Sequence, residues 1–288
     1  MKRKKKSNIV NWLLIIIFLA GVALLLYPTV SNQWNLLHQS RAIAGYAEAV
    51  SQIDDEEYER ILQAARAYNQ ELPNRTNRYS FSPEEQAEYE RMLNISGNGV
   101  MGYIEIPKIQ VTLPVYHGTS AEVLQVAVGH LSSSSLPVGG AGTHCVVSGH
   151  RGLPSAKLFT NLDQLAEGDL FMLQILDETL TYEVDRILIV EPEDVENLNI
   201  EEGKDYCTLV TCTPYGINSH RMLVRGHRVD NQEEAATVRV IADAVRIEPV
   251  LVAPAVAAPV LLILLIWLLA GTSGGGKKRT VNHEKEPS

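Results

Sequence analysis

The sequence predicts a mainly β domain with short helices, joined to a helical region and set between two segments that can span a membrane. Residues 101–229 read as many short strands with few helices, which is typical of a closed barrel or a sandwich. Residues 29–98 read mostly as helices instead. One apolar run stands near each end of the chain, at 9–27 and 250–270, and each is long enough to cross a bilayer. The strand pattern alone does not decide between a barrel and a sandwich.

Charge is divided unevenly along the 288 residues. Residues 28–276 hold 16 Lys and Arg against 32 Asp and Glu, which gives this middle part a formal net charge of −16. Such an acidic middle argues against binding of nucleic acid, because its charge repels phosphates. Basic clusters at 2–6 and 277–279 flank the two apolar runs on the sides away from the middle. Because basic flanks stay inside the cell, we expect both termini in the cytoplasm and the middle outside the cell.

The first apolar run is longer than the core of a cleaved signal peptide, so we expect it to remain as a membrane anchor. Pro254 and Pro259 should bend the second run, but its whole length still suffices for a span. The chain is therefore expected to be a multi-pass protein of the cell membrane. The expected divisions are a basic tail (1–8), an anchor (9–28), a helical region (29–98), a β domain (99–230), a linker (231–249), a second span (250–271) and a tail (272–288).

The helical region contains several start and stop signals. Residues 33–72 look helical, and Asp54 and Asp55 could cap a second helix within them. Residues 73–78 break the pattern. Ser82 then starts another helix, because a Pro follows at the first helical position and a Glu stands three residues after the Ser. We expect the apolar sides of these helices to pack on the β domain.

Within the β domain, short runs of strand-forming residues bounded by turn residues predict the individual strands. The expected strands cover 103–106, 111–115, 143–147, 170–176, 179–190, 206–210 and 222–224. Short helices are expected at 121–131 and 159–165. Between the first of these helices and the third strand lies a loop rich in Ser and Gly.

The stretch that carries the chemistry runs from Asp205 to Arg228 and reads as strand, turn and strand. The first strand opens into a loop at Cys212, turn residues follow at 214–218, and Arg221 stands near the start of the returning strand. A cysteine at a strand end, beside a loop and near a guanidinium, is placed for nucleophilic chemistry. The thiolate is the attacking form, and nearby positive charge or an imidazole stabilises it.

A cysteine nucleophile needs a proton partner, and His150 is the best candidate among eight His. It lies in the Gly-flanked turn SGHRG, directly after a predicted strand and about 60 residues before Cys212. Two strand ends can bring both side chains to one rim of a sheet or barrel. His130 and His144 also lie upstream of the Cys, and His144, on a strand without turn residues, is expected to be structural.

Two other arginines compete with Arg221 for the role beside the cysteine, namely Arg225 and Arg228. Residues four apart on an extended strand share a face, so Arg221 and Arg225 can point the same way. From the residues alone, position relative to Cys212 favours Arg221 only modestly.

Two further cysteines complete the set of three, which is too small for a disulfide scaffold. Cys145 lies five residues before His150, and Cys207 lies five residues before Cys212. If their strands are neighbours, these two thiols could lie side by side. We expect two small buried apolar residues, with a disulfide or a redox pair as the alternative.

Several of these stretches resemble the sortases: SGHRG, TLVTC, and an Arg nine residues after the Cys in SHRMLVRG. The stretches NGVMGYIEIPKI, VGHLSSSSLPVGG and TPYGINSHRMLVRG narrow the resemblance to the class C sortases, which assemble pili. The resemblance covers residues 99–228, and a second apolar segment near the C-terminus also fits class C. It implies an eight-stranded sortase β-barrel and leaves His130, in the VGHL stretch, outside the catalytic set.

The resemblance implies a cysteine transpeptidase that cleaves an LPXTG-type sorting signal between Thr and Gly through a thioester on Cys212. His150 would protonate the leaving Gly amine and then take a proton from the incoming amine. Arg221 would hydrogen-bond the substrate carbonyl or stabilise the oxyanion. The incoming amine would be a Lys side chain of the next pilin, and this chemistry needs no metal or organic cofactor.

Three other functions stay open at the level of the sequence. A sortase could instead anchor surface proteins to the peptidoglycan precursor, so that only the acceptor amine differs. A membrane-tethered cysteine hydrolase would release its substrate to water. A non-catalytic adhesion or scaffold domain would use Cys212 for packing alone, and the presence of all three expected residues argues against it.

Class C sortases carry an Asp-Pro-aromatic lid motif that reaches into the active site and covers the Cys. The corresponding place here reads Tyr79-Ser80-Phe81, so the aromatic Phe81 matches while Tyr79 stands where Asp is expected. A carboxylate that could pair with Arg221 is therefore missing. We expect a lid that is held more weakly, mainly by ring contact, and the alternative is an ordinary loop whose Phe81 packs on the domain.

Overall fold

A computed structural model of the chain describes residues 5–75, 78–231 and 262. The chain divides into two compact units, one built from 1–29 and 246–288 and the other from 30–245. The expected linker beyond Asn231, the expected second span apart from Leu262, and the expected tail at 272–288 lie outside the described residues. The same holds for the first four residues of the expected basic tail.

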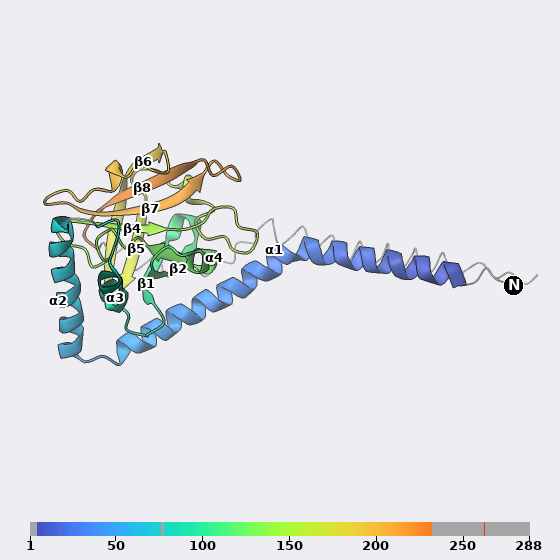
Figure 1. Ribbon diagram of the computed structural model, residues 1–288, viewed down its shortest axis with the longest axis horizontal. Helices are drawn as coiled ribbons and strands as arrows, with labels where there is room; N and C mark the ends of the chain where they lie inside the picture. The colour runs from blue at the N-terminus through green and yellow to red at the C-terminus, as the bar shows by residue number, and fades with distance from the viewer. Residues whose placement is uncertain (1–4, 76–77, 232–261, 263–288) are drawn as a thin grey trace, which may run out of the picture. The chain divides into compact units, whose positions relative to one another are not determined.

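The unit 30–245 is built around a closed barrel, to which the described residues contribute eight strands (Figure 1). The strands are β1 (Val100–Ile106), β2 (Val111–His117), β3 (Val128–His130), β4 (Thr143–Ser148), β5 (Leu170–Ile175), β6 (Glu178–Val190), β7 (Asp205–Thr213) and β8 (His220–Arg228). Their order around the barrel is β1-β2-β3-β4-β7-β8-β6-β5. The pairs β2–β3 and β4–β7 are parallel, and the six other neighbouring pairs among these strands are antiparallel. Closure of the barrel excludes the sandwich that the strand pattern had left open.

Parallel pairing of β4 with β7 brings the carboxyl ends of both strands to one rim of the barrel. Ser148 at the end of β4 is the partner of Val210 on β7, and β8 returns antiparallel beside β7. Alternate side chains of these strands point into the barrel, where Cys207 and Leu209 are fully buried. The loops that follow β4 and β7 therefore leave the barrel next to each other.

The seven expected strands are all present, but the expected helix at 121–131 is wrong in its second half. Helix α4 covers Ala121–Val126, and the next residues form β3. Val128 is β-branched, which favours a strand. Gly129 allows an unusually close approach, since a Cβ there would lie 2.1 Å from the carbonyl oxygen of Gly118. Pairing with β2 therefore overrides the helical pattern.

The expected helix at 159–165 is reduced to one turn of 3-10 helix, η3 (Leu162–Gln164). Leu158, directly before this segment, has a φ of 40°, which lies outside the α-helical region. At the next residue the preceding loop closes, since the amide of Phe159 donates to the carbonyl oxygen of His150 over 3.1 Å. The other 3-10 turns are η1 (Leu72–Asn74), η2 (Pro107–Ile109) and η4 (Glu196–Leu198).

The first helix, α1 (Lys5–Ser51), runs without interruption through Pro28, where the sequence suggested a boundary. An 18-residue stretch of α1 is strongly apolar, with a mean hydropathy of 2.6. Within the described part of the chain, α1 is therefore the one helix with the length and composition to cross a membrane. Farther along α1, polar side chains contact the barrel domain. Asn35 Nδ2 donates to the carbonyl oxygen of Ser155 over 2.8 Å, and Gln39 Nε2 donates to that of Val126 over 2.6 Å.

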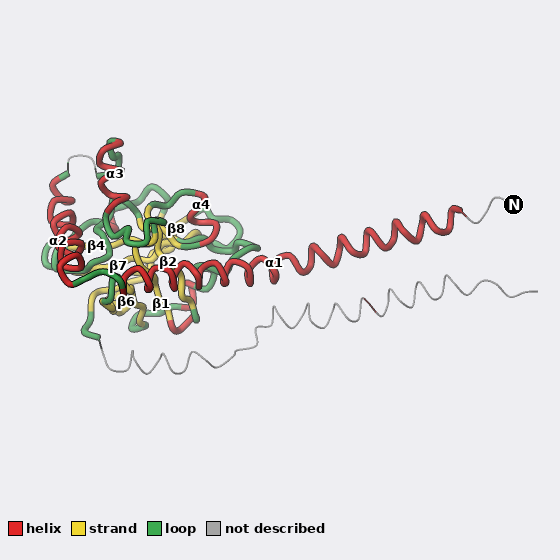
Figure 2. Tube along the Cα trace, turned by 90° about the horizontal axis from the view of Figure 1, so that it is seen from below, coloured by secondary structure: helices red, strands yellow, loops and turns green. Residues whose placement is uncertain are grey.

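Two further helices, α2 (Asp55–Glu71) and α3 (Pro83–Arg91), begin as the sequence predicts. Asp54 caps α2 through its side chain, and Ser82 forms a capping box with Glu85 at the start of α3. Figure 2 shows the strands gathered at the centre of the domain, with α2, α3 and α4 around them. The buried residues of α2 and α3 join the core of the barrel, and they include Leu62, Ala65, Tyr68 and Tyr89.

Candidate active site

Cys212 and Arg221 face each other across the β7–β8 pair. They are direct register partners, one residue from the end of β7 and one residue from the start of β8. Side chains of directly opposite residues lie on the same face of a sheet. Both residues are partly exposed, so the thiol and the guanidinium lie together at an accessible rim of the barrel.

His150 reaches the same rim from β4. The residue before it, Gly149, donates its amide to the carbonyl oxygen of Val210 over 3.0 Å. Its own carbonyl oxygen accepts a hydrogen bond from the hydroxyl of Thr211 over 2.8 Å. These two contacts hold the backbone of His150 next to the residues that precede Cys212. The three residues named from the sequence are therefore brought together by adjacent strand ends.

The electrostatic setting of His150 follows from its partial burial. Burial disfavours the imidazolium and lowers the pKa of His150 below its ordinary value of 6.5. At neutral pH the ring is therefore mainly neutral, and one ring nitrogen can accept a proton. This state suits a group that takes a proton from a thiol during attack.

Arg221 is oriented by the loop between β7 and β8. Its Nη1 donates to the carbonyl oxygens of Asn218 over 3.3 Å and of His220 over 3.1 Å. The side chain of His220 lies 3.2 Å from a carboxylate oxygen of Glu191 at the end of β6. These contacts fix one edge of the guanidinium against the loop, next to Cys212.

The competing histidines are held in structural hydrogen bonds. His130 is buried between the hydroxyl of Tyr89 at 2.9 Å and the carbonyl oxygen of Ser135 at 2.8 Å. His144 is buried between the carbonyl oxygen of Asn199 at 2.8 Å and the hydroxyl of Thr208 at 2.7 Å. Both rings are thus built into the packing of the domain. His220, the register partner of Thr213, also lies at the Cys212 rim, where its ring faces the carboxylate of Glu191.

The competing arginines also have other partners. Arg225 makes two hydrogen bonds to the carboxylate of Asp185, at 3.0 and 2.8 Å, and lies 4.1 Å over the ring of Tyr206. Arg228 lies 5.8 Å from the ring centre of Tyr182. Their positions along β8 place both arginines away from the end of the strand where Cys212 has its partner.

The residues of the expected lid lie between α2 and α3. Tyr79 is 56% exposed, and its hydroxyl accepts a hydrogen bond from Nη2 of Arg78 over 2.7 Å. The same nitrogen donates to the side chain of Asn199 over 2.7 Å. Phe81 packs edge-on against the ring of Tyr89 at 6.2 Å between centres. The expectation that Phe81 covers Cys212 stays a prediction.

The other two cysteines lie side by side, as expected if their strands were neighbours. Cys145 on β4 is the direct partner of Cys207 on β7, and both thiols are free and buried. Burial, together with the hydrogen bond to Cys145, raises the pKa of Cys207. Cys207 is therefore a protonated thiol, and both cysteines are buried in the core.

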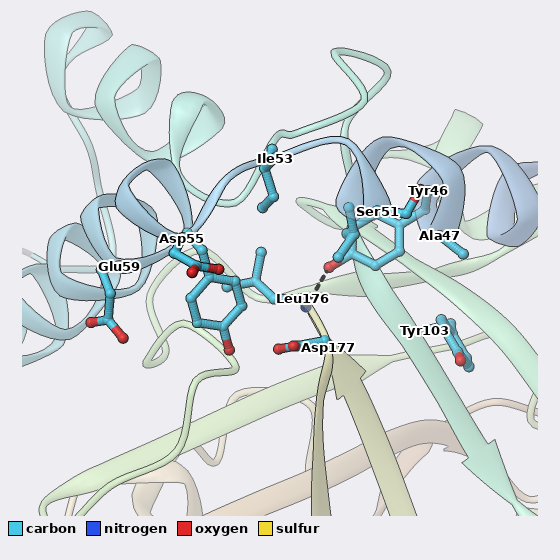
Figure 3. Close-up of a pocket in the computed structure, with 11 residues that line it drawn as sticks. Tyr46, Ala47, Ser51, Ile53, Asp55, Glu59, Tyr103, Leu176 and Asp177 are labelled. Carbon is cyan, nitrogen blue, oxygen red and sulfur yellow. Dashed lines mark hydrogen bonds between the residues drawn. The ribbon is translucent and has the colours of Figure 1, made fainter.

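A cavity of about 720 Å³ lies between the end of α1, the start of α2 and the turn from β5 to β6 (Figure 3). Tyr46, Tyr103 and Asp177 line it, and the hydroxyl of Tyr46 accepts a 2.7 Å hydrogen bond from the amide of Leu176. Strands β1 and β5 stand opposite β7 and β4 in the order around the barrel. This cavity is therefore separate from the Cys212 rim. Among the described residues, no group of three or more His, Cys, Asp or Glu could hold a metal ion.

The sequence analysis did not single out two residues that connect the strand end before His150 to the strand end at Cys212. Thr211 bonds to Gly149, and Arg151 bonds to Thr213, which follows Cys212. Both stand inside the motifs that were used, directly beside Cys212 in TLVTC and directly after His150 in SGHRG. Their position next to the two reactive residues was the available signal.

Comparison with known proteins agrees with this arrangement. A model of the sortase domain matches residues 104–229. Sortase C1 from Streptococcus agalactiae has a similar crystal structure, at 51% identity and a TM-score of 0.64, covering 67% of this chain and 100% of that chain. Sortase C from Streptococcus pneumoniae is similar at 45% identity and a TM-score of 0.59, covering 66% of this chain and 97% of that chain.

A more distant relative is Sortase D from Bacillus subtilis (strain 168), which is 33% identical over 131 residues. That match spans 44% of this chain and 63% of the length of Sortase D. The sortase C structures, in contrast, are covered along nearly their whole length. With 51% identity across the whole of a solved sortase C1, the chain belongs to the sortase family, and its solved relatives named here are class C sortases.

Proposed function

We propose that this chain is a membrane-anchored class C sortase, a cysteine transpeptidase that uses Cys212, His150 and Arg221. The observation that carries the proposal is the pairing of Cys212 with Arg221 across β7 and β8, on the rim where Gly149 holds His150 against β7. A nucleophile, a proton carrier and a cationic hydrogen-bond donor are the three groups that acyl transfer requires.

The first half of the reaction forms a thioester. Cys212 Sγ attacks the Thr carbonyl carbon of an LPXTG-type sorting signal, and neutral His150 accepts the thiol proton. The tetrahedral intermediate then collapses, the bond between Thr and Gly breaks, and His150 delivers its proton to the leaving Gly amine. Because burial lowers the pKa of His150, the imidazolium gives up this proton readily.

The second half transfers the acyl group to an amine. The incoming amine attacks the thioester carbonyl carbon, His150 takes a proton from the attacking nitrogen, and Cys212 leaves as a thiolate. That proton then returns to the thiolate, which restores the resting thiol and neutral imidazole. Splitting the exchange in this way replaces one difficult amide exchange by two easier acyl transfers.

We assign to Arg221 the stabilisation of the carbonyl oxygen that becomes negatively charged in each half of the reaction. Loop carbonyls already hold its Nη1, so the guanidinium is oriented before substrate binds. A donor that needs no reorganisation stabilises a developing oxyanion best. Arg225, which is engaged by Asp185, would be costly to redirect to this task.

The substrates follow from the family. Sortases act on proteins that carry a sorting signal, and we assign a Lys side chain of the next pilin subunit as the acceptor amine. The similarity to Streptococcus pneumoniae sortase C, whose structure bears on pilin substrate specificity, supports this acceptor. An amine of the peptidoglycan precursor is the alternative acceptor. The proposed chemistry uses no metal or organic cofactor.

The proposed lid is the segment around Tyr79 and Phe81. Contacts of Phe81 with Tyr89 and with the guanidinium of Arg75, 5.9 Å from its ring centre, would hold this segment when it covers the site. Because Tyr79 replaces the Asp of the class C motif, no carboxylate at that position would bind Arg221. The lid is therefore proposed to open easily.

The proposed placement in the cell rests on α1 and on the charge pattern. Helix α1 supplies the anchor, and residues 250–271 are proposed as a second span. Basic residues at 2–6 and 277–279 would then keep both termini in the cytoplasm. The helical region and the barrel, at 29–98 and 99–230, would face outward toward the cell wall.

Product analysis tests the proposal against its alternatives. The full-length protein in detergent micelles is incubated with an LPXTG-type peptide, together with a pilin domain or with a peptidoglycan-type amine. The proposal expects a new amide on a pilin Lys. Transfer to the wall amine alone would favour the anchoring sortase, and release of the cleaved peptide to water despite either amine would indicate a hydrolase.

A further inference from the structure

The segment that carries His150 is a closed loop, which we call the His150 loop (residues 150–159). Its ends meet where the amide of Phe159 donates to the carbonyl oxygen of His150 over 3.1 Å. An isolated bridge joins Leu153 to Ala156 within it. His150 therefore stands at the base of a compact loop, and the placement of the ring depends on how that base is held.

Arg151 connects this base to the strand end that follows Cys212. Its Nη1 donates to the hydroxyl oxygen of Thr213 over 3.4 Å, and its Nη2 pairs with the carboxylate of Asp163 over 2.5 Å. The side chain is 10% exposed. One side chain thus joins the neighbour of His150 to the neighbour of Cys212.

A second contact joins the His150 loop to the loop between β7 and β8. Gly152 has a φ of 77°, and a Cβ at this position would lie 2.9 Å from the ring of Tyr215. The guanidinium of Arg151 lies 6.0 Å from the centre of that ring. The φ of Gly152 disfavours any other residue at this position, and the exposed ring of Tyr215 would have to shift to make room for a Cβ.

The contacts of Arg151 add little to the stability of the fold. The ion pair of Arg151 with Asp163 adds little net stability, because the Asp163 side chain is 42% exposed and water screens the attraction. In addition, Nε of Arg151 is buried without a hydrogen-bond partner among the described residues, and a buried unpaired donor is destabilising. The geometry of the contact therefore calls for an explanation other than stability.

We propose that Arg151 is a positioning residue that sets the distance between His150 and Cys212. This inference rests on the proposed roles of those two residues. Proton transfer between a thiol and an imidazole requires them within hydrogen-bond reach, and a small displacement of one partner is enough to slow the reaction strongly. The carboxylate of Asp163 pairs with the guanidinium, and the hydroxyl of Thr213, next to Cys212, accepts a hydrogen bond from it.

The test compares variants of the full-length protein in detergent micelles, with an LPXTG-type peptide as substrate. Arg151→Ala should lower kcat by up to about 100-fold, with KM changed by less than about twofold because ground-state binding is kept. Arg151→Lys should recover part of this loss, since an ammonium can reach one partner but not hold both. Asp163→Ala should act in the same direction, and the double variant should resemble Arg151→Ala because the two residues act as one unit.

Asn35→Ala is the matched control. It removes a hydrogen bond to Ser155, in the middle of the same loop, and leaves the contact with Thr213 intact. Its kcat should stay within about twofold of wild type. If Arg151→Ala lowers the melting temperature but leaves kcat unchanged, or raises KM alone, the positioning role is wrong.

The titration of His150 gives a readout that does not depend on turnover. In the folded protein, NMR should show that Arg151→Ala raises the pKa of His150 toward 6.5, because the loosened loop exposes the ring to water. An unchanged titration together with unchanged kcat would overturn the inference. Failure of wild-type protein to form any acyl-enzyme would instead overturn the proposed function, while the titration would still report on the position of the ring.

Discussion

The hydroxyl of Thr211 donates a 2.8 Å hydrogen bond to the carbonyl oxygen of Gly149. Thr211 is 1% exposed and directly precedes Cys212, and Gly149 directly precedes His150. One buried hydroxyl therefore joins the two strand ends that carry the proposed nucleophile and its proton carrier. Because the strands are about 60 residues apart in the sequence, this contact exists only in the folded barrel.

Thr211→Val is expected to weaken both the fold and the reaction. The substitution keeps the shape of the side chain but leaves the Gly149 carbonyl oxygen without its donor, which should cost about 1–3 kcal/mol of unfolding free energy. The rate of acyl-enzyme formation should also fall, because His150 loses one of its backbone anchors. Thermal melting and quenched-flow acylation of the full-length protein measure the two effects.

Thr208→Val is the matched control for that variant. Thr208 is equally buried on the same strand and bonds to the side chain of His144, away from the Cys212 rim. It should lose stability with little change in the acylation rate of the remaining folded protein. Equal loss of rate in both variants would show that Thr211 acts on stability alone.

The pH dependence of acylation should reflect His150. Protonation of the ring removes its ability to accept the thiol proton, so the rate should fall as the pH drops through the pKa of His150. Burial lowers that pKa, so the acidic limb of the rate should lie below pH 6.5. Single-turnover acylation measured across the acidic range checks this, and an acidic limb above that value would contradict the assigned protonation state.

Alkylation should distinguish the three thiols by exposure. Cys145 is 2% exposed and Cys207 is fully buried, whereas Cys212 is partly exposed. Iodoacetamide should therefore add one adduct to the native protein, on Cys212, and three adducts after unfolding. Peptide mapping identifies the modified residue. Native labelling of Cys207 would mean that β4 and β7 separate readily, which the parallel ladder between them opposes.

Phe81→Ala should raise the alkylation rate of Cys212 only modestly. The expected lid lacks the Asp that would bind Arg221, so it should already open often, and loss of the ring changes this little. Tyr79→Ala is the control, because Tyr79 is mostly exposed and its hydroxyl accepts a hydrogen bond from Arg78. A large increase in labelling for Phe81→Ala alone would show that this ring by itself keeps the lid shut.

The strands and the helix caps were predictable because they depend on local signals. Ser82 and Glu85 form the expected capping box, and the expected strands are present. The short strand at Val128–His130 was missed, since it is stabilised by pairing with β2 and by the close approach of Gly129 to Gly118. Such contacts join separate elements of the chain, so a strand of three residues leaves no periodic pattern of its own.

The candidate site, like the fold, could be predicted only in part from the sequence. The motifs placed Cys212, His150 and Arg221 correctly at adjoining strand ends. From the residues alone, Arg221 was favoured over Arg225 only modestly, because residues four apart share a face of the strand. The structure separates the two, since Arg225 is bound to Asp185 and Arg221 is the partner of Cys212. The role proposed for Arg151 needed side-chain contacts that no sequence pattern encodes.

The acyl-enzyme is the most direct test of the central claim. Full-length wild-type protein and Cys212→Ala are each incubated in detergent micelles with an LPXTG-type peptide, and their intact masses are compared. The account predicts a mass gain equal to the peptide cut after Thr, present in wild type and absent from Cys212→Ala. The claim would be contradicted by the same adduct on Cys212→Ala, or by no adduct on wild type and on Phe81→Ala across several signal sequences.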